Sequence, residues 1–208
     1  MARLSRNQIL YDGCYSHVIS RSIRKMEIFR DEEDFKDFLD ALLRAKRESG
    51  FKIYHYCLMH THFHLAVEIP DVQDFSRAVQ KLKSQYICRF HSKYKISGPV
   101  WRERYQSLLI EDERYLYACG QYIEDNPVKA GMVSVSRNWK YSSSAYYSSG
   151  CKDEIVDGYG VNNNPTIPSD VDMEDASFFE NGVGIGSGYF RLQLNKSTKL
   201  ERQDLNVE

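Results

Sequence analysis

Residues 62–69 show the most regular alternation in the chain, and this pattern constrains the fold more than any other feature. Every second side chain is apolar, and the apolar set is Phe63, Leu65, Val67 and Ile69. The intervening set is His62, His64, Ala66 and Glu68, and Pro70 ends the segment. Because successive side chains of a strand point to opposite faces, the segment predicts a strand with one apolar face and one chemically varied face.

Neighbouring segments supply the partners that such a strand needs. Strands are expected at residues 15–23, at 51–59 and within 101–110. Helices are expected at 31–48, from 71 or 74 to about 93, and from 112 towards Asn126, each with apolar side chains at steps of three and four. Asp31 and Gly50 suit the two ends of the first helix. Pro127 disfavours helical geometry at Asn126, so the third helix is expected to end there.

The order of these elements indicates a fold class. The order strand, helix, strand, strand, helix, strand matches the split βαβ pattern of a ferredoxin-like fold. We therefore expect an α+β domain whose antiparallel sheet has helices on one face and the opposite face free for a ligand, followed by a third helix. Many functions share this fold, so the function must be argued from a site.

Composition divides the chain near residue 150. Residues 1–150 hold 23 Lys and Arg against 18 Asp and Glu, whereas residues 151–208 hold 5 against 11. The later part also contains Gly- and Asn-rich stretches at 158–165 and 180–188. We predict a basic domain at 1–150 that suits a polyanion, and a loosely structured acidic extension at 151–208 without an assigned function. The alternative is chance unevenness between a folded part and a solvated tail.

The sequence carries no mark of a membrane or secreted protein. No run of about 18 apolar residues is present, and no apolar stretch follows the basic N-terminal residues. The five cysteines are widely spaced and form no C-x-x-C pair, so neither a disulfide framework nor a zinc knuckle is expected. A reduced, cytoplasmic protein is the simplest interpretation.

His62 and His64 are candidates for metal binding. They are two residues apart on the expected strand, so their imidazoles project from the same face and suit a divalent metal. His60 has the same parity and is a candidate accessory ligand. Glu68, also on this face, is a candidate general base, and the alternatives are a structural carboxylate or a hydrogen-bond partner of a histidine. The alternative is a pair of half-exposed histidines on a solvated sheet face.

Tyr122 and Asn126 form a second candidate pair. They are four residues apart on the expected third helix and therefore lie one turn apart on the same face. An asparagine can give a metal its amide oxygen, and a tyrosine one turn away could present its hydroxyl to a phosphate held by that metal. Because the chain has 15 tyrosines, a tyrosine that only fills the core or an interface is the alternative.

Basic and aromatic residues interleave between Arg89 and Lys95 and again between Trp101 and Tyr105. In proteins that bind single-stranded nucleic acid, cations follow the backbone while aromatic rings stack on bases. The candidate DNA-binding residues are Arg21, Lys81, Lys83, Arg89, Trp101, Arg102 and Arg104, and Arg24 and Lys25 could extend the patch. The alternative is an ordinary solvated helix end and loop.

Taken together and in order, six segments resemble the HUH-type single-tyrosine transposases, in particular their REP-associated, RAYT-like branch. The segments are Tyr15–Arg21, Ile28–Asp31, Leu58–Leu65, Ser97–Tyr105, Tyr122–Val133 and Trp139–Ser144. One departure is that His60 and Thr61 stand where relatives often have Pro-Asn. The 151–208 extension matches no motif of the family.

The resemblance implies an enzyme that cleaves and rejoins single-stranded or hairpin DNA through a 5′-phosphotyrosine intermediate. It places the metal ligands on His62, His64 and Asn126 and the nucleophile on Tyr122, with Mg²⁺ or Mn²⁺ as the metal. REP-type palindromes as targets are implied by the resemblance alone. Related enzymes are monomers or dimers, so a monomer or a homodimer is expected.

Two other functions stay open at this point. A ferredoxin-like sheet can serve as a non-catalytic platform for single-stranded nucleic acid, with exposed aromatic rings that stack on bases. The varied face of residues 62–69 carries histidines rather than aromatic rings, which favours a metal site. A metal-dependent hydrolase with an activated water would need His62 and His64 but not Tyr122.

Overall fold

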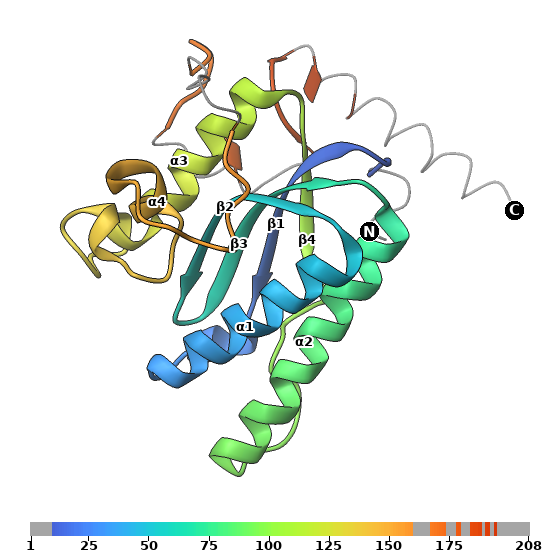
Figure 1. The fold of residues 1–208 in the computed structure, drawn as a ribbon, viewed down its shortest axis with the longest axis vertical. Coiled ribbons are helices and arrows are strands. Elements are labelled where there is room, and N and C mark those ends of the chain that lie inside the picture. The colour runs from blue at the N-terminus through green and yellow to red at the C-terminus, as the bar shows by residue number, and fades with distance from the viewer. Residues whose placement is uncertain are drawn as a thin grey trace, which may run out of the picture.

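The centre of the structure, a computed structural model, is a mixed sheet with the strand order β2-β3-β1-β4-β5 (Figure 1). The structure describes residues 10–159, 167–173, 178–179, 184–188, 190–191 and 194. The strands are β1 (Cys14–Arg21), β2 (Lys52–Met59), β3 (His62–Ile69), β4 (Gln106–Ile110) and β5 (Gly184–Ile185). The first four strands pair antiparallel, and β5 pairs parallel to β4. The predicted α+β class and its ferredoxin-like strand order are confirmed.

The register of β1 with β3 determines which side chains share a face. Arg21 lies opposite His62, and Ile19 lies opposite His64. Since paired residues project to the same side of a sheet, the odd-numbered residues of β1 lie on the face that carries the two histidines. Strands β1 and β3 are both central in the sheet, so each is hydrogen-bonded to a neighbouring strand on either side.

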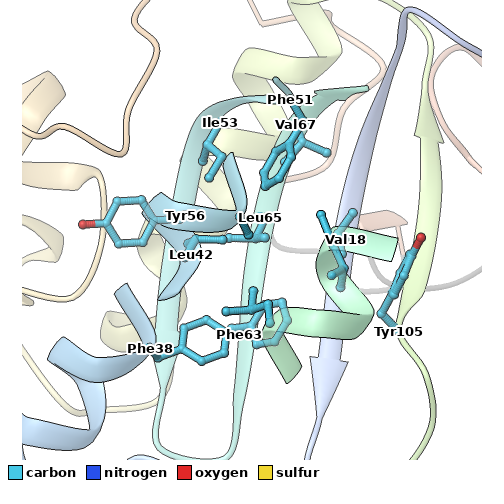
Figure 2. Packing of buried hydrophobic residues seen from close by; sticks show 14 of the residues in the cluster. Val18, Phe38, Leu42, Phe51, Ile53, Tyr56, Phe63, Leu65, Val67 and Tyr105 are labelled. Atoms are coloured by element: carbon cyan, nitrogen blue, oxygen red, sulfur yellow. The ribbon is translucent and has the colours of Figure 1, made fainter. Parts of the chain in front are cut away.

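Helices α1 (Glu32–Ser49) and α2 (Val72–Tyr94) lie side by side across the other face of the sheet (Figure 1). Asp31 caps α1 as predicted, because its side chain accepts a 3.1 Å hydrogen bond from the Asp34 amide. Gly50 ends α1 with a φ of 70°, a left-handed conformation that glycine adopts without strain. Figure 2 shows part of the core that these helices close: Val18, Phe38, Leu42, Phe51, Ile53, Tyr56, Phe63, Leu65, Val67 and Tyr105.

The expectation that the opposite face is free for a ligand is wrong. Helix α3 (Glu113–Lys129) packs on that face, against β1, β2 and β3. The reason lies in apolar side chains that come from several strands rather than from β3 alone. The buried apolar residues on this side of the sheet include Ile19, Cys57, Met59, Ala66, Leu108 and Ile110. Such a surface needs an apolar cover, and α3 provides it.

The expectation that the third helix ends at Asn126 is also wrong, because α3 continues through Pro127 to Lys129. Proline has no N–H to donate, so it cannot make the usual helical hydrogen bond to the carbonyl of Ile123. The side-chain amide of Asn126 donates to that carbonyl at 3.3 Å and to the carbonyl of Tyr122 at 2.9 Å. The asparagine therefore replaces the missing donor and stabilises the helix past the proline.

The chain also forms short helical elements. They are the 3₁₀ turns η2 (Ile23–Lys25) and η3 (Ser136–Asn138) and the helix α4 (Ser144–Ser149). Within the described residues, no helix is both long enough and apolar enough to cross a membrane. All five cysteines are free, in agreement with the predicted absence of a disulfide framework.

Parts of the 151–208 extension pack against the domain. Ile155 and Val156 join the core under α1 and α2, and Phe178 and Phe179 join the cluster under α3. Ile185 lies in β5 and is fully buried. The prediction of a loosely structured extension rested on the Gly- and Asn-rich stretches, and much of these stretches lies outside the described residues.

Replacing Leu42 with alanine should destabilise the protein by about 2–5 kcal/mol, because the side chain is fully buried against the sheet and its loss leaves a cavity. Urea denaturation followed by circular dichroism measures the change. Asp40→Ala on the exposed side of α1 is the matched control, and its effect should stay within about 0.5 kcal/mol. Equal unfolding midpoints for the two variants would contradict the described packing of α1.

Candidate active site

His62 and His64 lie side by side on β3, as their spacing predicts. Their ring centroids are 4.9 Å apart with an interplanar angle of 75°. His64 is fully buried, whereas His62, the first residue of the strand, is partly exposed. Both rings project from the sheet face that α3 covers, so the pair lies beneath this helix rather than on an open surface.

His17 on β1 is a third member of this site, and sequence reasoning missed it. Its Nε2 lies 2.9 Å from Nδ1 of His64, and the two rings stack at 5.1 Å. Its Nδ1 lies 2.7 Å from the backbone carbonyl oxygen of Phe179. The available signal was the position of His17 on a predicted strand, but the sequence does not reveal that β1 lies beside β3 in this register.

These contacts fix where the ring protons lie. A carbonyl oxygen only accepts, so Nδ1 of His17 donates to Phe179. Burial lowers the pKa of His17 to about 3, which keeps the ring neutral at neutral pH and makes its Nε2 an acceptor. Nδ1 of His64 therefore donates to His17. Burial, followed by the proximity of His62, holds the pKa of His64 well below its usual value, so its Nε2 keeps an unshared electron pair.

The fit of this site to a divalent metal rests on that nitrogen. Nε2 of His64 is buried and has no hydrogen-bond partner among the described residues. The nearby ring of His62 has its Nδ1 2.9 Å from the hydroxyl of Thr61, so its Nε2 is the nitrogen left for another ligand. Burial, and secondarily the charge of Arg21, lowers the pKa of His62 to about 4. Two neutral imidazoles on one face are suitable metal ligands.

Tyr122 lies on α3 above the His17 side of this group. Its ring meets the His17 ring edge to face with centroids 6.4 Å apart, and it stacks on Phe179 at 4.3 Å. The Lys129 ammonium lies 4.7 Å from the centroid of the Tyr122 ring. Only 2% of Tyr122 is exposed, so the structure brings the tyrosine to the histidines but covers it with Phe179.

Asn126 lies one turn of α3 beyond Tyr122, as predicted. Its amide nitrogen is engaged with the helix carbonyls of Tyr122 and Ile123. The side-chain oxygen is thus the atom of Asn126 that can serve a metal, and the residue is half-buried. Within the described residues no three His, Cys, Asp or Glu side chains form a metal-binding group.

The position of α3 over β2 is set by a buried polar contact. Nδ1 of His55 lies 2.8 Å from a carboxylate oxygen of Glu124, which also accepts a 2.6 Å hydrogen bond from Ser143. Nε2 of His55 lies 2.8 Å from the hydroxyl of Tyr159. Gly120 allows this approach, since a Cβ atom there would lie 2.1 Å from the His55 ring. Glu124 and Tyr122 share one helix, so this contact also positions the tyrosine.

His60, the candidate accessory ligand, is not brought to the histidine pair. Its Nδ1 lies 2.7 Å from the backbone carbonyl oxygen of Phe29. Its ring packs against Phe35 at the start of α1 and against Trp139. His60 lies in the turn between β2 and β3, where the strict alternation of the strand no longer decides the direction of a side chain.

Glu68, the candidate base, lies at the far end of β3. It shares the face of His64, but four residues of strand place it roughly 13 Å away along the chain. Its carboxylate accepts a 2.7 Å hydrogen bond from the Tyr54 hydroxyl and forms a 3.1 Å ion pair with Lys52. Through these two contacts Glu68 links β3 to β2 and helps to hold the two strands together.

Two of the DNA-binding candidates, Arg21 and Arg102, line a cavity of about 730 Å³ at the end of β1. We call it the basic cavity, and its lining consists of Arg21, Ser22, Ile23, Arg24, Lys25, Thr61, His62 and Arg102. His62 therefore belongs both to the histidine pair and to the wall of the basic cavity. Arg104 is exposed nearby in the same loop as Arg102.

The remaining candidates are engaged elsewhere. Lys83 is buried and donates to the carbonyls of Glu103 and Arg104, so it supports the loop from within. Trp101 packs its ring against Phe63 and Tyr86. Lys81 and Arg89 form ion pairs from α2 to α1, with Glu48 and Asp37 respectively.

Comparison with known proteins identifies the family. The model of the family described as "Transposase IS200 like" matches residues 10–126, which is more than half of the chain and includes His17, His62, His64, Tyr122 and Asn126. The chain belongs to the IS200-like transposase family.

The chain can also be compared with two individual proteins. A REP-associated tyrosine transposase, by its given name, from Haemophilus influenzae is 31% identical over 118 residues. That match spans 51% of this chain and 66% of the relative, so just under two thirds of the relative's length is covered. A solved structure of a REP-associated tyrosine transposase bound to a REP hairpin superposes with a TM-score of 0.60 at 20% identity. It covers 79% of this chain and 96% of its own, which supports the fold.

Gly120→Ala should destabilise the protein by about 1–3 kcal/mol or more, because the added methyl group would overlap the His55 ring, which is held by Glu124 and Tyr159. Urea denaturation measures the effect. Gln121→Ala, at the neighbouring and less buried position, is the control and should unfold close to wild type. An unchanged midpoint for Gly120→Ala would show that α3 does not approach β2 as described.

Proposed function

We propose that this transposase cleaves and rejoins single-stranded or hairpin DNA with Tyr122 as nucleophile and with Mg²⁺ or Mn²⁺ held by His62, His64 and Asn126. The observation that carries the proposal is the buried Nε2 of His64 beside His62, which has no hydrogen-bond partner in the described part of the chain. A buried polar atom without a partner costs free energy. A bound metal would give Nε2 of His64 a partner and so explain why a histidine stands at this position.

The donor set agrees with this assignment. Two neutral imidazole nitrogens from β3 and an amide oxygen from α3 would leave positions open for phosphate oxygens and water. When bound, the metal would polarise the scissile phosphate and stabilise negative charge on it. His17 would keep the His64 ring oriented and its proton on Nδ1, as second partners of metal-binding histidines do.

The reaction would proceed by exchange of phosphodiester bonds. The Tyr122 oxygen loses its proton and forms a bond to phosphorus, while the bond from phosphorus to the 3′ oxygen breaks and that oxygen takes up a proton. The product is a 5′-phosphotyrosine and a free 3′-hydroxyl. A second 3′-hydroxyl reverses the exchange and releases Tyr122. One phosphodiester replaces another, so no external energy source is required.

Access to Tyr122 requires a local change. In this conformation Phe179 stacks on the tyrosine ring, and its backbone carbonyl holds His17. A phosphate can reach the hydroxyl only when residues 178–179 move aside. These residues belong to the extension but also to the cluster under α3, so their movement would release the carbonyl that His17 contacts.

The proposal of a hairpin substrate draws on the solved relative, which is described as bound to a REP hairpin. Transfer of that substrate class to this chain is part of the proposal, and REP-type palindromes are its most specific form. The rival platform for base stacking has less support, because α3 covers the sheet face on which bases would stack. A hydrolase with an activated water is separated from the proposal by the need for Tyr122.

Tyr122→Phe should abolish covalent attachment to DNA, because the variant lacks the attacking oxygen. The measurement is incubation with labelled hairpin DNA and Mn²⁺ followed by a denaturing protein gel. Tyr117→Phe, which changes a tyrosine on the same helix, is the matched control and should keep the adduct. Cleavage by Tyr122→Phe without an adduct would support the hydrolase, and binding without cleavage by wild type would support the non-catalytic module.

His17→Phe should weaken Mn²⁺ binding about 10- to 100-fold, because it removes the acceptor that orients His64. Isothermal titration calorimetry without DNA measures this directly. His17→Gln keeps an acceptor in the side chain and should recover part of the affinity. Wild-type affinity in His17→Phe, or no measurable Mn²⁺ binding by wild type, would contradict the proposed ligand set.

A further inference from the structure

We propose that the basic cavity binds the sugar-phosphate backbone of the single-stranded nucleotides that directly flank the scissile phosphate. The inference rests on the proposed function, since it takes His62 as a metal ligand. It extends that function by assigning a substrate-binding site to residues 21–25, which neither the metal site nor the nucleophile explains.

The charge of the cavity is the first argument. Arg21, Arg24, Lys25 and Arg102 all line it, and no carboxylate does so among the described residues. In the described part of the chain, the side chains of Arg24, Lys25 and Arg102 have neither an ion pair nor a hydrogen bond. Cations gathered in a concave surface attract a polyanion more strongly than the same charges spread over an open surface.

An unpartnered hydroxyl is the second argument. Ser22 is only 4% exposed and lines the cavity, and its Oγ has no hydrogen-bond partner among the described residues. Its backbone N–H donates to the carbonyl of Thr61 at 2.9 Å, so the backbone that carries the hydroxyl is held at the wall of the cavity. A hydroxyl buried without a partner is unfavourable, and a phosphate oxygen in the cavity would accept a hydrogen bond from it.

Backbone strain is the third argument. Arg24 and Lys25 have φ values of 52° and 56°, so two consecutive residues other than glycine adopt the left-handed conformation. The turn is held by hydrogen bonds from Ile23 to the Val100 carbonyl at 2.8 Å and from Met26 to the Ile23 carbonyl at 2.9 Å. Such strain persists where the direction of the side chains matters, and here both side chains line the cavity.

Continuity with the metal site identifies the occupant. His62 contributes to both sites, so a strand whose phosphate lies at His62 and His64 must continue past the cavity or into it. The volume of about 730 Å³ exceeds the needs of one phosphate group and falls within the roughly 300–1,000 Å³ of typical ligand sites. A groove of cations that follows the backbone is the usual means of holding a single strand.

The experiment measures binding without cleavage. Fluorescence anisotropy with a labelled oligothymidylate of about 20 nucleotides is recorded at several salt concentrations, in EDTA, with the Tyr122→Phe protein. The double change Arg24→Gln/Lys25→Gln should weaken binding about tenfold at low salt. It should also reduce the slope of log affinity against log salt by about 1.4, since each contact with a single strand contributes about 0.7. Ser22→Ala should weaken binding severalfold and leave the slope unchanged.

Arg44→Gln/Arg77→Gln is the matched control. It removes two positive charges from exposed positions of α1 and α2, towards the opposite end of the sheet from His62. Its affinity should stay within about twofold of the parent with an unchanged salt slope. Equal losses in the two double variants would overturn the proposal, because overall charge alone would then explain binding.

Two further measurements test the role of Lys25 and the choice of single-stranded DNA as the occupant. Lys25→Gly removes one charge and relieves the left-handed strain, so it should unfold no earlier than the parent while its salt slope falls by about 0.7. An unchanged slope in this folded variant would overturn the inference. A duplex of the same length should respond to Arg24→Gln/Lys25→Gln no more than to the control, and a larger loss for duplex than for single strand would contradict a single-stranded occupant.

These outcomes are separable from failure of the proposed function. Absence of Mn²⁺-dependent cleavage in wild type would refute the function, whereas the binding experiment needs neither metal nor nucleophile. Wild-type binding by Arg24→Gln/Lys25→Gln in a protein that cleaves DNA would refute only the assignment of the cavity.

Discussion

The structure of the site depends on one buried hydrogen bond, from Nδ1 of His64 to Nε2 of His17. It joins the two central strands across their α3 face and, with the carbonyl of Phe179, determines which nitrogen of each ring carries a proton. The result is a fully buried nitrogen on His64 that has an unshared electron pair and no partner among the described residues. Such an atom costs free energy in the interior, and the proposed metal would give it a partner.

Helix α3 places Tyr122 near the buried nitrogen of His64. The apolar residues of the sheet attract the helix, and the contact of His55 with Glu124, made over Gly120, sets its position. Tyr122 is thereby held above His17 on the same rigid scaffold. Phe179 then covers Tyr122, so a tyrosine held by the core is closed off by a residue of the extension.

Local pattern in the sequence predicts most of the scaffold. The alternation at 62–69, the cap at Asp31 and the glycine at 50 led to elements that agree with the structure within one or two residues. The errors come from interactions that no local pattern contains. His17 joins the site through strand register, Lys83 turns inward to reach a loop, and α3 passes Pro127 because Asn126 supplies a side-chain donor. Each depends on residues that are brought together only by the fold.

The most direct test of this account is the anomalous diffraction of crystals soaked in Mn²⁺, measured at a wavelength where manganese scatters anomalously. The account predicts one strong peak bonded to Nε2 of both His62 and His64, with the side-chain oxygen of Asn126 directed towards it. A map at saturating Mn²⁺ in which Nε2 of His64 has no metal neighbour, or in which the metal binds elsewhere on the chain, would contradict it.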